Sequence, residues 1–279
     1  MLVGARARVR IDGGRDSPFK AQATDNTTCD LGNAFHDVIM NGSYQYPVDV
    51  MVVVYEKVDS QGNTIGYGQY SAAVDSTDWL QAAIGTDTES VKEQVVKEFQ
   101  NNTGQNIIID NVYLANSNNN PPTVDPSTGE VTGNYLFRAV VPSNDQVVPG
   151  GYFKVTMTVW LTISSSDGSY GSAGEWLTKI LAGVLTGSSN AKPNDSQVYD
   201  NNAGGLESAT LTVSDNGNTV ILEIDYEPSS DTTLQYFKYR YWDDQAGVEE
   251  WAFTFTPSTA PNATGGVTNT YKLNVAPPC

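Results

Sequence analysis

The sequence predicts a mainly β protein, an antiparallel β-sandwich or jelly-roll-like fold with one or two short helices packed on its sheets. Only 17% of its 279 residues are charged, while Asn, Ser, Thr, Gly and Tyr are abundant, a composition typical of many strands joined by polar turns. Clusters of turn residues separate short stretches of alternating polarity. The clearest stretch has apolar residues at every second position: Val155, Met157, Val159, Leu161 and Ile163.

Residues 1–45 are expected to form an extended N-terminal arm. The first stretch alternates arginine with apolar residues, which predicts a strand with one basic face, and residues 13–45 show little periodicity. Such an arm gains stability by lying across its own body or across a neighbour's. The alternative is a solvated first strand. Five of the fifteen basic residues lie in residues 1–20, and they form the candidate assembly arm: Arg6, Arg8, Arg10, Arg15 and Lys20.

The charge is distributed unevenly along the chain. Residues 1–20 carry five basic residues against Asp12 and Asp16, a net charge of +3. Because the whole chain has a net charge of −17, the remaining residues carry −20. An acidic body resists non-specific nucleic-acid binding, whereas a basic segment attracts an acidic neighbour or an enclosed polyanion. We therefore expect no specific nucleic-acid recognition. Adaptation to high salt is a second explanation for the acidic composition.

Residues 46–150 are expected to form a first β layer or subdomain. Residues 48–58 predict a central strand with both faces covered, followed by a hairpin turn over 59–63 and a partner strand over 64–74. A helix is predicted over residues 87–100, because Thr86 and Glu89 fit a capping box and Val91, Val95 and Phe99 repeat every four residues. Strands over 107–114 and 135–141 complete this layer.

Residues 151–279 are expected to form a second β layer or subdomain with a C-terminal tail. The strand over 155–163 leads into a short helix at 175–185, where apolar residues recur at helical spacing until Gly187. Hairpins follow over 209–224 and 237–255, the second with alternating aromatic residues on both strands. A short strand over 268–275 ends the chain.

No motif for catalysis, a cofactor or a metal is found. His36 is the chain's only histidine, no phosphate-binding glycine loop is present, and two distant cysteines give no zinc framework. The sequence therefore predicts a non-enzymatic protein. Two alternatives remain at the aromatic hairpin: Trp242 and Trp251, flanked by acidic pairs, are a candidate carbohydrate platform, and acids beside such a platform are also found in glycosidases.

Several features bear on location and modification. No apolar run approaches about 18 residues, so no membrane span is predicted, and the N-terminal residues do not fit a signal peptide. Cys29 and Cys279 are a candidate disulfide, with free thiols as the alternative. The turns at 59–63 and 125–130 suit Asx-type turns better than calcium loops. Glycosylation motifs are present at Asn26, Asn41, Asn101, Asn194 and Asn262.

The combination of a β-sandwich, a basic arm, an acidic body and no catalytic motif resembles virion building blocks. Tail-tube proteins of tailed viruses are similar in pairing an acidic β body with a helix. This resemblance rests on architecture and not on signature residues. It implies a virion component, a capsid shell or tail-tube subunit, that contacts copies of itself and other virion proteins. The alternative is an extracellular adhesin or filament subunit at the cell surface with carbohydrate-binding ability. If residues 1–20 were folded back into their own subunit and contacted no other copy, the first hypothesis would have to be abandoned.

Overall fold

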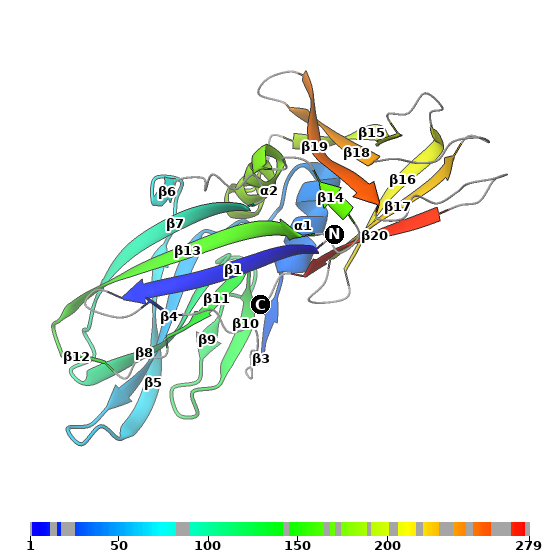
Figure 1. The fold of residues 1–279 in the computed structure, drawn as a ribbon. Coiled ribbons are helices and arrows are strands. Elements are labelled where there is room, and N and C mark those ends of the chain that lie inside the picture. The colour runs from blue at the N-terminus through cyan, green and yellow to red at the C-terminus, as the bar shows by residue number, and fades with distance from the viewer. Residues whose placement is uncertain are drawn as a thin grey trace.

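A computed structural model describes residues 2–11, 16–17, 26–81, 90–141, 145–164, 168–170, 174–188, 191–200, 206–215, 220–228, 237–243, 248–257 and 269–276. Within these residues the fold is mainly β, with antiparallel sheets packed together and two short helices, as predicted. Figure 1 shows both helices between the larger body and the strands of the last third of the chain. The first elements are β1 (Leu2–Ile11), β2 (Asp16–Ser17), β3 (Asn26–Cys29), α1 (Leu31–Asn41), β4 (Val50–Val58), β5 (Thr64–Ala73), β6 (Trp79–Gln81), β7 (Ser90–Gln100), β8 (Asn106–Ala115), β9 (Thr123–Val124), β10 (Val131–Tyr135) and β11 (Phe137–Val140).

The remaining elements complete four sheets among the described residues. The large sheet has the order β16-β17-β20-β1-β13-β7-β6 with β2 beside β1, and the five-stranded sheet has the order β11-β8-β4-β5 with β12 beside β8. Two smaller sheets have the orders β3-β10-β9 and β14-β19-β18-β15. The later elements are β12 (Gln146–Val147), β13 (Tyr152–Ser164), β14 (Gly168–Tyr170), α2 (Gly174–Thr186), β15 (Ala191–Asp200), β16 (Leu206–Asp215), β17 (Val220–Pro228), β18 (Phe237–Asp243), β19 (Val248–Pro257) and β20 (Asn269–Ala276).

The sandwich core lies between the large sheet and the five-stranded sheet. Alternate residues of β13, from Phe153 to Leu161, are buried, as the period of two predicted. Tyr70 of β5 packs against Phe99 of β7 and Phe153 of β13, with ring centroids 6.0 Å apart in both pairs. β6 and β7 come from the range 46–150 but pair into the large sheet with β13. The large sheet is therefore assembled from both halves of the chain, whereas the strands of the five-stranded sheet all come from the range 46–150.

The strand β4 is central, as its apolar residues on both parities predicted. Its residues Val50 to Tyr55 are buried, and it pairs with β5 on one side and β8 on the other. The β4–β5 hairpin closes through Asp59, whose Oδ1 accepts hydrogen bonds from the backbone N–H groups of Gln61 and Asn63. Gly62 has φ 84° in this turn, a conformation that favours glycine. The predicted Asx-type turn is confirmed.

The helix predicted over residues 87–100 is wrong. Residues 90–100 form the strand β7, which pairs antiparallel with β13 along its length, and residues 82–89 lie outside the described part. The error has a physical reason: a spacing of four residues fits one face of a helix, but it is also even and so fits one face of a strand. Glu93 and Lys97 share that face with the buried Val95.

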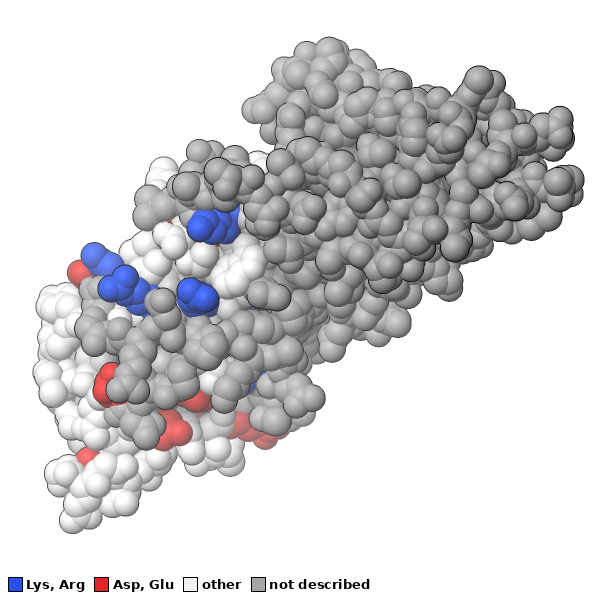
Figure 2. Space-filling model, in the orientation of Figure 1, with Lys and Arg blue, Asp and Glu red and all other residues white. Residues whose placement is uncertain are grey.

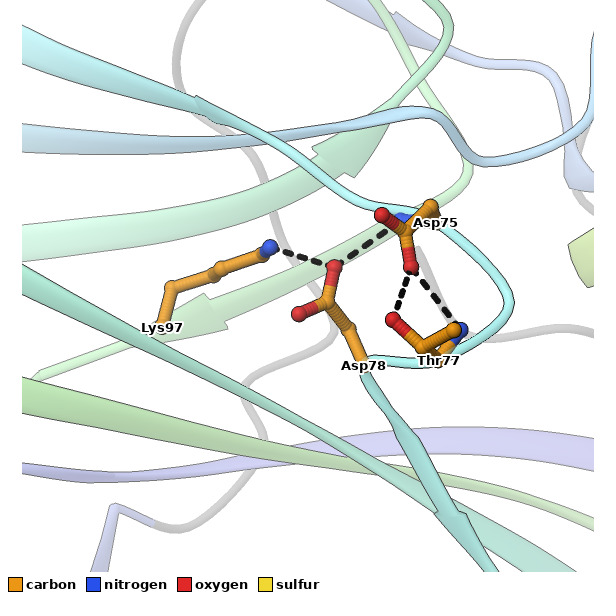
Figure 3. Close-up of polar contacts among 4 residues, drawn as sticks. All are labelled: Asp75, Thr77, Asp78 and Lys97. Carbon is orange, nitrogen blue, oxygen red and sulfur yellow. Dashed lines mark hydrogen bonds and ion pairs between the residues drawn. The ribbon is translucent and has the colours of Figure 1, made fainter.

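Lys97 on this face forms an ion pair. Its ammonium contacts Asp78, in the turn before β6, and the side chains of both residues are about four-fifths buried. Figure 3 shows how that turn holds the acid: Asp78 Oδ2 accepts from the Asp75 N–H at 2.9 Å, and Asp75 Oδ1 accepts from the Thr77 N–H at 2.8 Å. A lysine at the border of the core is tolerated because an oriented carboxylate neutralises it.

The expectation of an extended arm over residues 1–45 also needs correction. β1 is an inner strand of the large sheet, antiparallel to β13 from Leu2 to Ile11 and parallel to β20 at its start. Residues 31–41, expected to be extended, form the helix α1. Both helices bury an apolar face, and the predicted helix at 175–185 is confirmed as α2. The first 45 residues therefore belong largely to the chain's own fold.

The sequence signal for α1 was present but was missed. Its buried residues have the spacing i, i+3, i+4, i+7, i+8 that is typical of an amphipathic helix. Gly42 ends the helix with φ 74°, and its N–H donates to the Val38 carbonyl at 2.9 Å. The buried residues are Leu31, Ala34, Phe35, Val38 and Ile39.

Candidate functional site

The first candidate site is a basic face on the outer side of the large sheet. Side chains alternate across a strand, so the residues between the buried positions of β1, β13 and β7 point to solvent. This basic face is defined by four exposed cations: Arg8, Arg10, Lys92 and Lys154. Figure 2 shows Lys and Arg gathered over this part of the body, while Asp and Glu lie mainly along its lower border in the view.

Polar and aromatic residues separate the cations of the basic face. The Arg8 guanidinium lies 5.8 Å from the centroid of the half-buried Trp160 ring, a cation–π contact. The Gln94 amide donates to Thr158 Oγ1 at 2.9 Å across β7 and β13. Among the described side chains of these three strands' outer side, Glu98 is the one acid. Among the described side chains alone, four cations against one acid give a net charge of +3, in a chain whose net charge is −17.

An acidic end lies at the tips of two neighbouring hairpins. We define this acidic end by Glu56, Asp59, Asp125 and Glu130. The two hairpins are joined where the Tyr67 N–H donates to the Pro126 carbonyl at 3.0 Å. Hydrogen bonds lower the pKa of Asp59, the largest from the Asn63 side chain, and those led by the Ser127 side chain lower the pKa of Asp125 to about 2. Both carboxylates are therefore charged throughout the neutral range.

The turn at residues 125–130 is an Asx-type turn, as the sequence predicted. Asp125 Oδ1 accepts from the N–H groups of Ser127 and Thr128 at 2.8 and 2.9 Å. The carboxylate thus stabilises the turn itself, as Asp59 does in its own hairpin.

The second candidate site is a polar pocket of about 250 Å³ where the start of α1 meets the segment after α1 and the loop before β9. Its lining includes two carboxylates, amide side chains and two tyrosines. The Tyr44 and Tyr46 rings meet edge to face, with centroids 6.1 Å apart. No lysine or arginine of the described chain is among the lining residues. The residues used below are Asp30, Asp37, Tyr44, Tyr46, Asn119 and Asn134.

The polar pocket is held together by backbone and side-chain hydrogen bonds. The Asp30 N–H donates to the Tyr135 carbonyl at 2.8 Å, which fixes the start of α1 to β10. The Asp30 side chain makes no capping hydrogen bond to α1 and instead accepts from the Asn119 amide. Asn119 Oδ1 in turn accepts from Asn134 Nδ2 at 3.5 Å. On the other side, the Tyr44 N–H donates to the Gly187 carbonyl at the end of α2.

Burial shapes the protonation of this pocket. Desolvation raises the pKa of Asp30, and the hydrogen bond from Asn119 opposes part of that rise. Burial, followed by the negative charges of Asp30 and Asp37, raises the pKa of Tyr44. The Tyr44 phenol is therefore a hydrogen-bond donor at any physiological pH. The Asp37 carboxylate lies 3.2 Å from Nδ1 of His36.

The predicted site residues fall into three groups. Arg8 and Arg10 belong to the basic face, Arg6 is placed by its backbone opposite Trp160, and Arg15 and Lys20 lie outside the described residues. The backbones of Trp242 and Trp251 lie on the paired strands β18 and β19, but their side chains are outside the described part. Cys29 is disulfide-bonded, and the sequence's other cysteine, Cys279, lies outside the described residues, so the pairing stays a prediction.

Sequence reasoning missed both Lys92 and Lys154 of the basic face and the whole polar pocket. The lysines could have been found by continuing the alternation of β13 outward and by assigning β7 as a strand. The pocket gave no sequence signal, because its residues come from segments about 90 positions apart. Asn101, in one of the glycosylation motifs, is fully buried, whereas Asn41 is exposed at the end of α1.

The described residues hold neither a cluster of metal-ligating side chains nor a membrane-spanning helix. No cluster of three or more His, Cys, Asp or Glu suited to a metal ion is found there. No helix in that part of the chain has the length and apolar character needed to cross a membrane. In comparisons with known proteins, no family model, curated protein or solved structure matches this chain.

Proposed function

We propose that this protein is a non-enzymatic structural subunit that assembles with copies of itself by docking its basic face on the acidic end of the next copy. The observation that carries the proposal is the separation of charge: four exposed cations occupy one face of the large sheet in a strongly acidic chain. A component of a virion shell or tail tube, in contact with other virion proteins, is the setting that the sequence favours.

The two surfaces suit each other chemically. The basic face offers arginine and lysine side chains at fixed positions on paired strands, and the acidic end offers carboxylates, two of them oriented by turn hydrogen bonds. Complementary charges steer association and select the register between partners more than they add affinity. Because exposed charges are screened within about 10 Å at 0.1 M salt, the association is expected to weaken as salt increases.

A contact between two different surfaces has a consequence for the assembly. Each copy offers its basic face to one neighbour and its acidic end to another, so the interface is heterologous. Such interfaces form closed rings when the rotation between copies closes, and helical filaments when it does not. Both outcomes fit a shell or tube subunit.

The support for this proposal differs from what the sequence suggested. β1 lies inside the sheet of its own subunit, so it is not an arm that reaches a neighbour, and that argument is lost. Removing residues 1–20 would delete an inner strand and unfold the body, so truncation is not an informative test. What remains is that Arg8 and Arg10 face outward from β1 beside Lys92 and Lys154.

The first test removes charge from the basic face. The double variant Arg10→Gln and Lys154→Gln is compared with Ser71→Asp and Asn102→Asp, which changes the net charge equally at exposed sites elsewhere. Sedimentation velocity at low and high salt, with negative-stain electron microscopy, reports the assembly state. We expect the native protein and the control to assemble at low salt and the basic-face variant to stay monomeric.

The second test reverses both surfaces. Arg10→Glu with Lys154→Glu changes the net charge of the basic face from +3 to −1. Glu56→Lys with Gln61→Lys and Glu130→Lys changes the net charge of the acidic end from −4 to +1 while leaving the turn aspartates in place. Each variant alone is expected to fail to assemble, and mixing the two is expected to restore co-assembly. A native protein that is monomeric at low salt overturns the proposal. Binding of a mixed-sequence oligonucleotide by such a monomer would place a polyanion on the basic face instead.

The alternative is an extracellular adhesin or filament subunit with carbohydrate-binding ability. Trp242 and Trp251 give it no support, because their side chains are outside the described part. The observation that favours sugar binding is the polar pocket, at a different place in the fold.

A further inference from the structure

We infer that the polar pocket between α1 and the loop before β9 is a binding site for a neutral saccharide unit. The pocket has about 250 Å³ of space, and carboxylates, amides and tyrosines line it. It is distinct from the basic face, which lies on the outer side of the large sheet. The inference therefore does not depend on the assembly proposal.

The side chains around the pocket are oriented beyond what the fold requires. Asp30 precedes α1 at a position where an aspartate ordinarily accepts hydrogen bonds from the first turn of the helix. Its carboxylate makes no such bond and is held by the Asn119 amide, which Asn134 fixes in turn. The Asp30 carboxylate is thus held in the pocket lining, at the desolvation cost that raises its pKa. Side chains locked by a second layer of hydrogen bonds are typical of preorganised binding sites.

The hydrogen-bonding groups match those of sugar hydroxyls. Each hydroxyl both donates and accepts, so it pairs best with a lining that offers both kinds of group. Asp30 and Asp37 accept, the Tyr44 phenol donates, and Asn134 keeps an amide oxygen and a second N–H that no bond to Asn119 uses. Tyr46, half-buried beside Tyr44, adds an aromatic surface for the apolar face of a sugar ring.

Other small ligands fit the pocket less well. Anions such as phosphate or sulfate are disfavoured, because the lining holds two carboxylates and no lysine or arginine of the described chain. A calcium ion needs six to eight oxygen ligands. Here the Asn119 nitrogen, rather than its oxygen, is turned toward Asp30, and the Asn119 oxygen already accepts from Asn134. The geometry therefore suits a neutral polyhydroxyl ligand.

The test measures sugar binding to the full chain. Glucose, galactose, mannose and N-acetylglucosamine are screened by saturation-transfer NMR, and binding constants are measured by titration calorimetry. We expect at least one of these sugars to bind without added metal. Losing a hydrogen bond to a charged group weakens binding about tenfold or more. We therefore expect Asn119→Ala and Asp30→Asn each to bind the sugar at least about tenfold more weakly than the native protein. Asn118→Ala is the matched control, since Asn118 is exposed next to Asn119 and is not in the lining.

Three outcomes would overturn the inference. The first is no binding of any of the four sugars. The second is calorimetric binding of calcium chloride alone, which would make the pocket a cation site. The third is equal sugar binding by Asn119→Ala and Asn118→Ala. Tyr46→Ala gives an independent loss of binding if Asp30→Asn proves unstable by circular dichroism. Repeating the titration with Arg10→Gln and Lys154→Gln separates the sugar result from the assembly result.

Discussion

Replacing Asn101 by aspartate tests how the end of the sandwich is held. Asn101 follows β7, is fully buried, and uses both hydrogens of its amide: Nδ2 donates to the carbonyls of Gln105 and Val147 at 2.8 and 2.7 Å. Its Oδ1 accepts from the N–H and the hydroxyl of Thr103. One side chain thus joins the turn after β7 to β12.

The substitution keeps the shape of the side chain and removes both donors. A carboxylate oxygen would then face two carbonyl oxygens at hydrogen-bonding distance, so the loss is larger than that of an ordinary hydrogen bond. Leaving a buried polar group unsatisfied costs about 1–3 kcal/mol. For the two carbonyls together we expect Asn101→Asp to lower the free energy of unfolding by about 3 kcal/mol, which corresponds to a fall in Tm of roughly 6–12 °C.

Urea unfolding at neutral pH measures the effect, with Asn102→Asp as the control. Asn102 is the next residue and is exposed, so it undergoes the same charge change with an expected effect within about 0.5 kcal/mol. If the two variants unfold at the same urea concentration, the role assigned to Asn101 is refuted. The burial also predicts that the glycosylation motif at Asn101 stays unmodified after secretion from eukaryotic cells, which peptide mass spectrometry checks.

Three further predictions follow from charge and covalent structure. Burial on the inward side of β7 raises the pKa of Glu93. Glu93→Gln should therefore be more stable than the native protein at pH 7, and this difference should vanish below about pH 4. Equal stability at pH 7 would contradict the inward position. Asp125 has a lowered pKa, so Asp125→Asn should be less stable at pH 7, and its deficit should disappear between about pH 4 and about pH 2. Denaturation midpoints measured against pH test both. Peptide mapping without reductant should give a Cys29–Cys279 linked peptide, and a Cys29–Cys29 linked peptide would contradict that pairing.

Where the sequence predicted an element correctly, the signal was local. The alternation in β13 gave the strand and its buried side, because neighbouring side chains point to opposite faces. The turn residues from Asp59 onward correctly predicted the β4–β5 hairpin, and the apolar spacing that ends at Gly187 correctly predicted α2. Each depends on residues within about one turn or one strand of each other.

Where the sequence failed, the deciding contacts were distant. The spacing of Val91, Val95 and Phe99 fits a helix and a strand equally, and pairing with β13, some 60 residues later, decided for the strand. In α1 the helical spacing was present, but polar and glycine-rich neighbours on both sides hid it. The candidate sites were out of reach for the same reason, since the basic face joins three strands and the pocket joins residues from Asp30 to Asn134.

The sequence by itself determined the mainly β class, the acidic charge with a basic beginning, and the period of each strong strand, because these depend on composition and on near neighbours. Only the tertiary structure decided that β1 is an inner strand of its own subunit, with Arg8 and Arg10 brought beside Lys92 and Lys154. Strand order in a sheet is set by which apolar faces bury one another across long loops, and no local pattern carries that information.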